Sequence, residues 1–338
     1  MGDTMTLLEQ ATPAEAPETR LPSVLEPMAA DLARLEAFLR DDTGVGFALL
    51  GQILQSTFAS GGKRIRPALV FGVAQLGQAD PQAVLYHAAA VETLHAASLV
   101  HDDLVDGALL RRGMPTINKR WGAGATVLAG DWLFARSAGF SASTGQVGVV
   151  QLFAKTLGDL SGGELRQLFG RRGIPSREEY AYRIYAKTGS LFQTCTEGSA
   201  LLMGLDPDRV DALARFGREL GMAFQVVDDL LDFTASEAGL GKPVGSDLRS
   251  GQVTLPALLH LQAHPEAAPW LRNGASSEAA QVDALIEAIR NDAAALEGAQ
   301  RAAEAHIEQA VEALRVMPAS PARDALEAVA RYVVARDR

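Results

Sequence analysis

Apolar residues recur at spacings of three and four along almost the entire chain, which is the rhythm of amphipathic α-helices. This rhythm predicts helices at about 22–39, 49–58, 124–140, 146–170 and 177–203, separated by breaks that contain glycine or proline. From about Ser276 it predicts two or three alanine-rich helices, the last beginning at Ser320-Pro321. No run of alternating apolar and polar residues predicts a strand. The pattern is therefore that of an all-α protein.

Local signals place several helix starts. Pro67 and Pro81 are expected at the first position of two helices, where the fixed proline ring suits the turn. Ser176 and Glu179 form a capping-box signature at the start of another helix. Asp206, which a proline follows, is expected to cap a further long helix. The helices that begin at Pro81 and Asp206 each lead into a strongly acidic segment.

No linker rich in glycine, proline or serine divides residues 21–338, so we expect them to form one domain. The predicted architecture is a single bundle of roughly ten or more helices around a central cavity. Residues 1–20 are acidic, contain two prolines and are expected to form a disordered tail. They lack the basic start and apolar core of a secretory signal.

Two acidic clusters lie within apolar helical segments. They are Asp102, Asp103 and Asp106, and, 126 residues later, Asp228, Asp229 and Asp232. Residues four apart on a helix share a face, so the first and last aspartate of each cluster should point the same way. Buried carboxylates are costly unless a cation neutralises them, and Mg²⁺ that also contacts a diphosphate would do so. The alternative, two solvated helix faces, is disfavoured because apolar residues precede both clusters.

Composition narrows the class of function. The chain has 31 basic and 41 acidic residues, and its net charge of −10 argues against a nucleic-acid-binding protein. The one cysteine, Cys195, lies in an apolar helical segment and is expected to be a buried structural residue. A single cysteine also fits a reducing compartment, so we expect a cytoplasmic protein. No run of about twenty apolar residues predicts a transmembrane segment.

Basic residues stand near glycine turns and acidic clusters, where they could meet phosphate oxygens. They are Lys63, Arg64 and Arg66 after a Gly-Gly turn, Arg111 and Arg112 after the first cluster, Lys187 on a helix, and Lys242 in the glycine-rich segment 239–245. His95 and Gln225 lie on the same helix faces as Asp102 and Asp228, which follow seven and three residues later. For each basic residue the alternative is a solvated surface charge, and for His95 it is interior packing.

These motifs resemble those of the trans-isoprenyl diphosphate synthases, the polyprenyl synthetase family. The resemblance spans about residues 25–335 and rests on Gly61 through Pro67, His95 through Asp106, Arg111-Arg112-Gly113, Gly130-Asp131, Lys187-Thr188, Phe224 through Asp232 and Gly241-Lys242-Pro243. It implies the isoprenoid synthase fold. It also implies an enzyme that condenses isopentenyl diphosphate with an allylic diphosphate, 1′-4 and trans.

The resemblance also assigns roles to individual residues. It implies that roughly two or three Mg²⁺ ions bind Asp102, Asp106 and Asp228, with support from Asp103, Asp229 and Asp232. It assigns isopentenyl diphosphate to Lys63, Arg66, His95 and Arg112. It assigns the allylic diphosphate to Arg111, Lys187, Thr188, Gln225 and Lys242, and Lys187 joins the six aspartates as a catalytic group. A homodimer is implied as well, and product delivery at a membrane surface is compatible with it.

One segment departs from the family pattern. After Asp247-Leu248-Arg249-Ser250-Gly251 the family often has lysine, whereas this chain has Gln252. A positive charge near the allylic diphosphate is then missing. Lys242 or Arg249 could substitute for it.

Product length should depend on the helix that leads into the first cluster, because the growing tail would run along it. One turn before Asp102 stand Ala97 and Ser98, where family members with fifteen- or twenty-carbon products commonly have a bulky aromatic residue. The small side chains predict an open path and a long product of roughly six to ten isoprene units. Candidate floor residues on other helices are Phe134, Phe153, Leu157 and Met203.

The sequence leaves three alternative functions. A short-chain farnesyl or geranylgeranyl diphosphate synthase would share the acidic clusters and basic motifs. A class I terpene cyclase also uses an Asp-rich helix and Mg²⁺, but the usual Asn-x-x-x-Ser-x-x-x-Glu motif is absent from this sequence. A non-catalytic subunit of a heteromeric synthase would lose Asp-rich motifs, and this chain has both.

Overall fold

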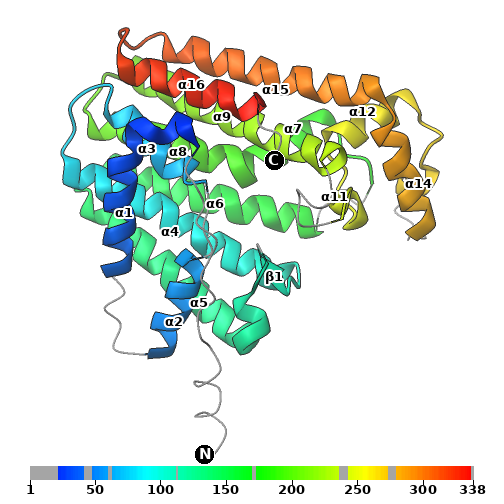
Figure 1. The fold of residues 1–338 in the computed structure, drawn as a ribbon, viewed down its shortest axis with the longest axis horizontal. Helices are drawn as coiled ribbons and strands as arrows, with labels where there is room; N and C mark the ends of the chain where they lie inside the picture. The colour runs from blue at the N-terminus through cyan, green and yellow to red at the C-terminus, as the bar shows by residue number, and fades with distance from the viewer. Residues whose placement is uncertain are drawn as a thin grey trace, which may run out of the picture.

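The computed structural model describes residues 22–41, 48–59, 63–111, 113–169, 173–235, 243–272 and 279–335. Over these ranges the chain is mostly helical, so the all-α prediction is confirmed (Figure 1). The expected tail, 1–20, lies outside the described residues. The helical elements are η1 (Ser23–Met28), α1 (Ala29–Asp41), α2 (Ala48–Ala59), α3 (Ile65–Ala74), α4 (Pro81–Val105), α5 (Ile117–Ser143), α6 (Val147–Phe169), α7 (Arg177–Ile184), η2 (Tyr185–Gly189), α8 (Ser190–Leu202), α9 (Pro207–Thr234), α11 (Ser246–Arg249), α12 (Leu255–Ala263), α13 (Pro269–Arg272), α14 (Ala279–Arg290), α15 (Ala293–Leu314) and α16 (Pro321–Ala335).

One short hairpin follows α4, contrary to the expectation of no strand. In it β1 (Leu110–Arg111) pairs antiparallel with β2 (Met114–Pro115). Two-residue strands are too short to produce an alternating pattern, which is why the sequence did not predict them. The hairpin lies directly after the first acidic cluster, at one end of the bundle (Figure 1).

Several predicted helix starts are confirmed. Pro81 is the first residue of α4, behind the capping residue Asp80. The capping box of Ser176 and Glu179 opens α7, and Asp206 caps α9. Helices α4 and α9 therefore begin where the sequence predicts, and both acidic clusters lie in their C-terminal turns.

The helix start predicted at Pro67 is wrong by two residues, because α3 begins at Ile65. Arg64 precedes it in the left-handed backbone conformation, with a φ of 51°. The Arg64 guanidinium forms ion pairs with Glu92 of α4 and Glu36 of α1. These ion pairs hold the Arg64 side chain against α1 and α4.

Helices α4, α8 and α9 form the interior of the bundle. Helix α8 packs against α3, α4, α6 and α9, while α5 lies along α4 and α15 lies along α9 (Figure 1). Phe192 and Phe216 are fully buried there, and so is Cys195, as expected. By length and composition α4 could cross a membrane, but 72% of its most apolar window is buried inside the protein. It is the core helix of this bundle.

A π-helical turn, η2, joins α7 to α8 within the segment that the sequence predicts as one helix. Glycines on both neighbouring helices let it pack closely. A Cβ on Gly163 of α6 would lie 2.7 Å from Cβ of Ala186, and a Cβ on Gly221 of α9 would lie 2.8 Å from Cα of Gly189. Single π turns are rare in proteins, and those that occur are often found at functional sites.

Candidate active site

The first acidic cluster lies at the C-terminal end of α4. Asp102 is half-buried, Asp106 is exposed and Asp103 is buried. Oδ1 of Asp103 accepts a hydrogen bond from Nε of Arg111 at 2.8 Å. Arg111, predicted to bind the allylic diphosphate, is therefore held at the edge of the cluster by a carboxylate.

Burial raises the pKa of Asp102 to about 6, with Lys187 opposing the shift and Glu164 and Asp106 adding to it. The ionised form of Asp102 is thus disfavoured by its surroundings. A divalent cation bound to the oxygens of Asp102 and Asp106 would remove this cost, and carboxylate oxygens are ligands that Mg²⁺ prefers. The donor set fits the magnesium that the resemblance implies.

The second cluster lies at the C-terminal end of α9. Asp228 is half-buried, whereas Asp229 is buried. Asp229 accepts hydrogen bonds from the Tyr180 hydroxyl and from Nε2 of Gln225, both at 2.8 Å. Burial, followed by the negative charge of Asp247, raises the pKa of Asp229 to about 7. Asp228 is therefore the more accessible ligand and Asp229 an internal group that these hydrogen bonds hold.

Asp232 connects the second cluster to α11. It is 1% exposed, and its two oxygens accept hydrogen bonds from Oγ of Ser246 at 2.9 Å and from the backbone nitrogen of Asp247 at 3.2 Å. The sequence spacing predicts that Asp232 shares a face with Asp228. In the structure its carboxylate instead fixes the start of the segment that follows the cluster.

Lys187, in η2, carries a positive charge that acts on the first cluster. Its Nζ lies 2.8 Å from Oε1 of Glu164 on α6. Burial lowers the pKa of Lys187, but the charges of Asp102 and Glu164 outweigh burial and raise it overall. The adjacent Thr188 donates a hydrogen bond at 2.7 Å to Oε1 of Gln225, the residue that supports the second cluster. Hydrogen bonds therefore connect η2 to the second cluster on α9, while the charge of Lys187 acts on Asp102 of the first cluster.

Two of the residues predicted to bind isopentenyl diphosphate, Arg66 and His95, lie in contact. Nη1 of Arg66 lies 3.2 Å from Nε2 of His95, and the Arg66 guanidinium carbon lies 5.0 Å from the centre of the Phe192 ring. Arg66 and His95 are half-buried, as is Lys63 just before α3. His95 lies two helical turns before Asp102, so this basic group stands on the N-terminal side of the first cluster.

The two residues expected to control product length lie on α4. Ala97 has no exposed surface and packs against apolar residues of α2 and α5. The Ser98 hydroxyl donates to the carbonyl oxygen of His95 at 2.9 Å. One turn before Ala97 a small apolar pocket begins; it is lined by Leu39, Leu54, Phe58, Thr93, Trp132, Leu133, Arg136 and Phe140. Along α4, Ala97 therefore lies between the first cluster and this pocket.

Of the candidate floor residues, Phe134 packs against the apolar cluster that contains Ala97. Phe153 is part of the main core, and Phe134, Leu157 and Met203 pack at its margin. The lining of the described pocket includes none of these four. Its aromatic side chains come instead from α2 and α5, the helices that flank α4.

Three residues of the site escaped the sequence analysis: Glu164, Tyr180 and Arg183. Nη2 of Arg183 donates to the carbonyl oxygen of Val253 at 2.7 Å, and its charge acts on Asp229. Tyr180 and Arg183 stand three residues apart on α7, a helical-face spacing that could have revealed them. Glu164 had no such signal, because it belongs to a different helix.

Other predicted residues do not add to the described site. Arg112 and Lys242 lie outside the described residues. Arg249, considered as a substitute for the lysine missing at Gln252, forms an ion pair with Asp283 of α14 and donates from Nε to the carbonyl oxygen of Val244 at 3.2 Å. The positive charge of Arg183 lowers the pKa of Asp229, against the larger effect of burial.

The sequence profile of the Polyprenyl synthetase family matches residues 47–291. An octaprenyl diphosphate synthase of Escherichia coli (strain K12) is 35% identical over 323 residues, which cover 94% of this chain and 99% of that protein. The crystal structure of a decaprenyl diphosphate synthase from Rhodobacter capsulatus superimposes with a TM-score of 0.85 at 33% identity, covering 93% of this chain and 98% of that one. A polyprenyl synthase from Caulobacter crescentus, complexed with calcium and isoprenyl diphosphate, gives a TM-score of 0.85 at 33% identity and covers 93% and 97%.

Proposed function

The chain belongs to the polyprenyl synthetase family, and from this we propose that it condenses isopentenyl diphosphate with an allylic diphosphate to make a long-chain all-trans polyprenyl diphosphate. It is a trans-prenyltransferase of the isoprenoid synthase fold. The observation that carries the proposal is the position of η2. The charge of Lys187 acts on Asp102, and the neighbouring Thr188 donates a hydrogen bond to Gln225, which supports the second cluster. A positive charge at this position suits an anionic substrate held between the two acidic clusters.

We assign magnesium to Asp102, Asp106 and Asp228, the more accessible carboxylates of the two clusters. Roughly two or three ions per site match this donor set. When bound, the metal would neutralise these carboxylates and draw negative charge onto the leaving diphosphate. The related Caulobacter crescentus structure, with calcium and isoprenyl diphosphate, supports a divalent metal in this family.

The basic residues of this chain would hold the two substrates. Lys63, Arg66 and His95 bind the diphosphate of isopentenyl diphosphate, and Lys187 and Thr188 bind that of the allylic substrate. The allylic C–O bond breaks, the double bond of isopentenyl diphosphate forms the new C–C bond, and a proton then passes to the released diphosphate. The buried groups around these residues orient both substrates and exclude water.

The small residues Ala97 and Ser98 support a long product rather than a short one. Neither carries a bulky group, so a growing tail would meet no large side chain at these positions of α4 on its way toward the apolar pocket that Thr93 helps to line. The octaprenyl and decaprenyl synthases among the relatives agree with this assignment. A cyclase or a non-catalytic subunit is disfavoured, because both acidic clusters and the basic pair Arg66–His95 are in place.

We further propose a homodimer, from the family resemblance, and a cytoplasmic enzyme, from the single cysteine. Delivery of the product at a membrane surface would follow from its long hydrocarbon tail.

The test is product analysis with purified protein, isopentenyl diphosphate and Mg²⁺, using dimethylallyl, geranyl, farnesyl and geranylgeranyl diphosphates as primers in turn. We expect all-trans products of roughly six to ten isoprene units on reversed-phase chromatography. Products that stop at fifteen or twenty carbons would contradict the long-chain assignment. Absence of any elongated product with every primer would contradict the prenyltransferase assignment itself.

A further inference from the structure

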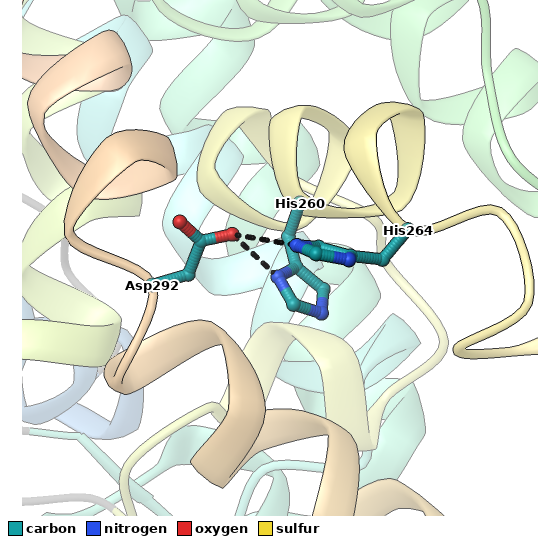
Figure 2. A group of neighbouring side chains, drawn as sticks. All are labelled: His260, His264 and Asp292. Carbon is teal, nitrogen blue, oxygen red and sulfur yellow. Dashed lines mark hydrogen bonds and ion pairs between the residues drawn. The ribbon is translucent and has the colours of Figure 1, made fainter.

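A second group of metal-ligand side chains lies where α12 ends and α15 begins (Figure 2). His260 and His264 come from α12 and its C-terminal cap, and Asp292 caps α15. Nδ1 of His260 lies 2.7 Å from Oδ2 of Asp292, and Nε2 of His264 lies 3.8 Å from the same oxygen. Both imidazole rings are therefore directed at one carboxylate oxygen.

The local structure holds these donors in place. His260 and His264 are four residues apart and extend from the same side of the chain. Oδ1 of Asp292 accepts a hydrogen bond from the backbone nitrogen of Ala295 at 3.1 Å, which leaves Oδ2 for the histidines. His260 is buried, so its ring is also fixed by packing.

The spacing is close to that of a tetrahedral metal site. Ligand distances of about 2.0–2.1 Å around Zn²⁺ place neighbouring ligand atoms about 3.4 Å apart. The 3.8 Å between His264 and Asp292 needs to close slightly, and the 2.7 Å between His260 and Asp292 needs to open. The half-exposed side chain of His264 has room to make this adjustment.

Glu266 places a further carboxylate near His264. Its Oε1 lies 3.8 Å from Nδ1 of His264, the ring nitrogen that faces away from Asp292. Metal-binding histidines commonly have a carboxylate near the second ring nitrogen, where it fixes the tautomer that leaves the other nitrogen free to bind. The group thus has three side chains that can bind a metal directly, and Glu266 lies beside one of them.

We propose that His260, His264 and Asp292 bind one divalent transition-metal ion, with Zn²⁺ as the expected ion and water completing the coordination. The ion would replace the proton that now lies between His260 and Asp292, and this proton would leave to solvent. Two imidazole nitrogens favour Zn²⁺ over Mg²⁺, which prefers oxygen ligands. The site is chemically distinct from the all-carboxylate clusters and would tie α12 to α15.

The experiment compares tag-free wild-type protein with His264→Ala and with a matched control, Gln262→Ala, an exposed residue of α12 that carries no metal ligand. Zn²⁺ binding is measured by calorimetry in excess Mg²⁺ without substrate, after treatment with a chelator. Thermal unfolding is recorded with and without Zn²⁺, and Co²⁺ replaces Zn²⁺ for absorption spectroscopy.

Wild type and Gln262→Ala should bind one Zn²⁺, gain thermal stability from it, and give the visible bands of nitrogen-ligated Co²⁺. His264→Ala should lose more than about tenfold in Zn²⁺ affinity and lose the thermal shift, because even outer partners of metal sites contribute about tenfold. Equal Zn²⁺ affinity in wild type and His264→Ala would overturn the proposal. So would loss of binding in Gln262→Ala. These measurements use no substrate, so their outcome is separate from that of the product analysis.

Discussion

Nζ of Lys187 lies 2.8 Å from Oε1 of Glu164, so the lysine that faces Asp102 is held by a carboxylate from another helix. Under the proposed assignment of Lys187 to the allylic diphosphate, that diphosphate would compete with this carboxylate for the same ammonium group. The pair is partly exposed, which limits the energy of its interaction.

Replacing Lys187 with glutamine should lower kcat/KM for the allylic diphosphate by about tenfold to a hundredfold, because a charge-assisted hydrogen bond is lost. Replacing Glu164 with glutamine should have the opposite effect on KM, lowering it by about twofold to fivefold. Steady-state kinetics with varied allylic diphosphate measures both. A higher KM in Glu164→Gln would contradict the competition, and Lys155→Gln, which removes an ammonium elsewhere on α6, is the control.

Replacing Asp102 or Asp228 with alanine should reduce kcat by at least about a hundredfold, because a metal ligand at the reacting diphosphate is lost. The helical content should not change, since neither side chain is fully buried. Turnover assays and far-ultraviolet circular dichroism measure the two effects. The control is Asp211→Ala, at an exposed position of α9. Near-wild-type turnover in either site variant would contradict the assignment of that residue to the metal.

Replacing Ala97 with phenylalanine should shorten the product, because a bulky ring would then stand between the first cluster and the pocket lined by Thr93. Overpacking should also cost about 1–3 kcal/mol of stability. Chromatography of the products measures the length. Ala305→Phe, at an exposed position of α15, should leave product length as in wild type. An unchanged product in Ala97→Phe would show that the tail takes another route.

His87 should make the protein less stable in acid. Burial lowers the pKa of His87 to about 4, against the hydrogen bond to the Thr194 carbonyl. In the unfolded chain histidine has a pKa of about 6.5, so the unfolded state gains a proton first as pH falls from 6.5 toward 4. Stability present above pH 6.5 is therefore lost in this window, by about 2 kcal/mol at pH 5.

Urea unfolding at pH 7.5 and pH 5 tests this effect. The pH-dependent loss of unfolding free energy should be about 2 kcal/mol smaller in His87→Gln, which cannot gain a charge, than in wild type. Gln262→Ala, at an exposed position without a titratable group, should keep the pH dependence of wild type. An equal loss of unfolding free energy in wild type and His87→Gln would contradict the prediction, because it would mean that His87 gains its proton equally well in the folded protein.

The sequence predicted those parts of the site that depend on spacing within one helix. The positions of His95 and Asp102 on α4 and of Gln225 and Asp228 on α9 followed from helical periodicity, and all four lie on the predicted helices. The contact of Arg66 with His95 agrees with the family resemblance. The first two relationships depend on spacing along one helix, and the third on sequence motifs shared with the family.

Side-chain contacts between different helices could not be predicted from the sequence. Tyr180 bonds Asp229 across 49 residues, and Glu164 reaches Lys187 from α6. Neither pair has a spacing that periodicity can recognise, because tertiary packing alone brings the partners together. The same holds for Asp232, whose helical position predicted a face but not the hydrogen bonds to α11.

The π turn η2 changes the direction in which the side chains that follow it point, relative to those of α7 before it. In an uninterrupted α-helix, residues seven apart such as Tyr180 and Lys187 point within about 20° of the same direction. The wider winding of η2 shifts that phase: the Tyr180 hydroxyl bonds Asp229 of α9, while Lys187 forms an ion pair with Glu164 of α6. Deleting one residue from η2 would restore the α-helical phase and turn Lys187 away from its present direction, although every functional side chain remained.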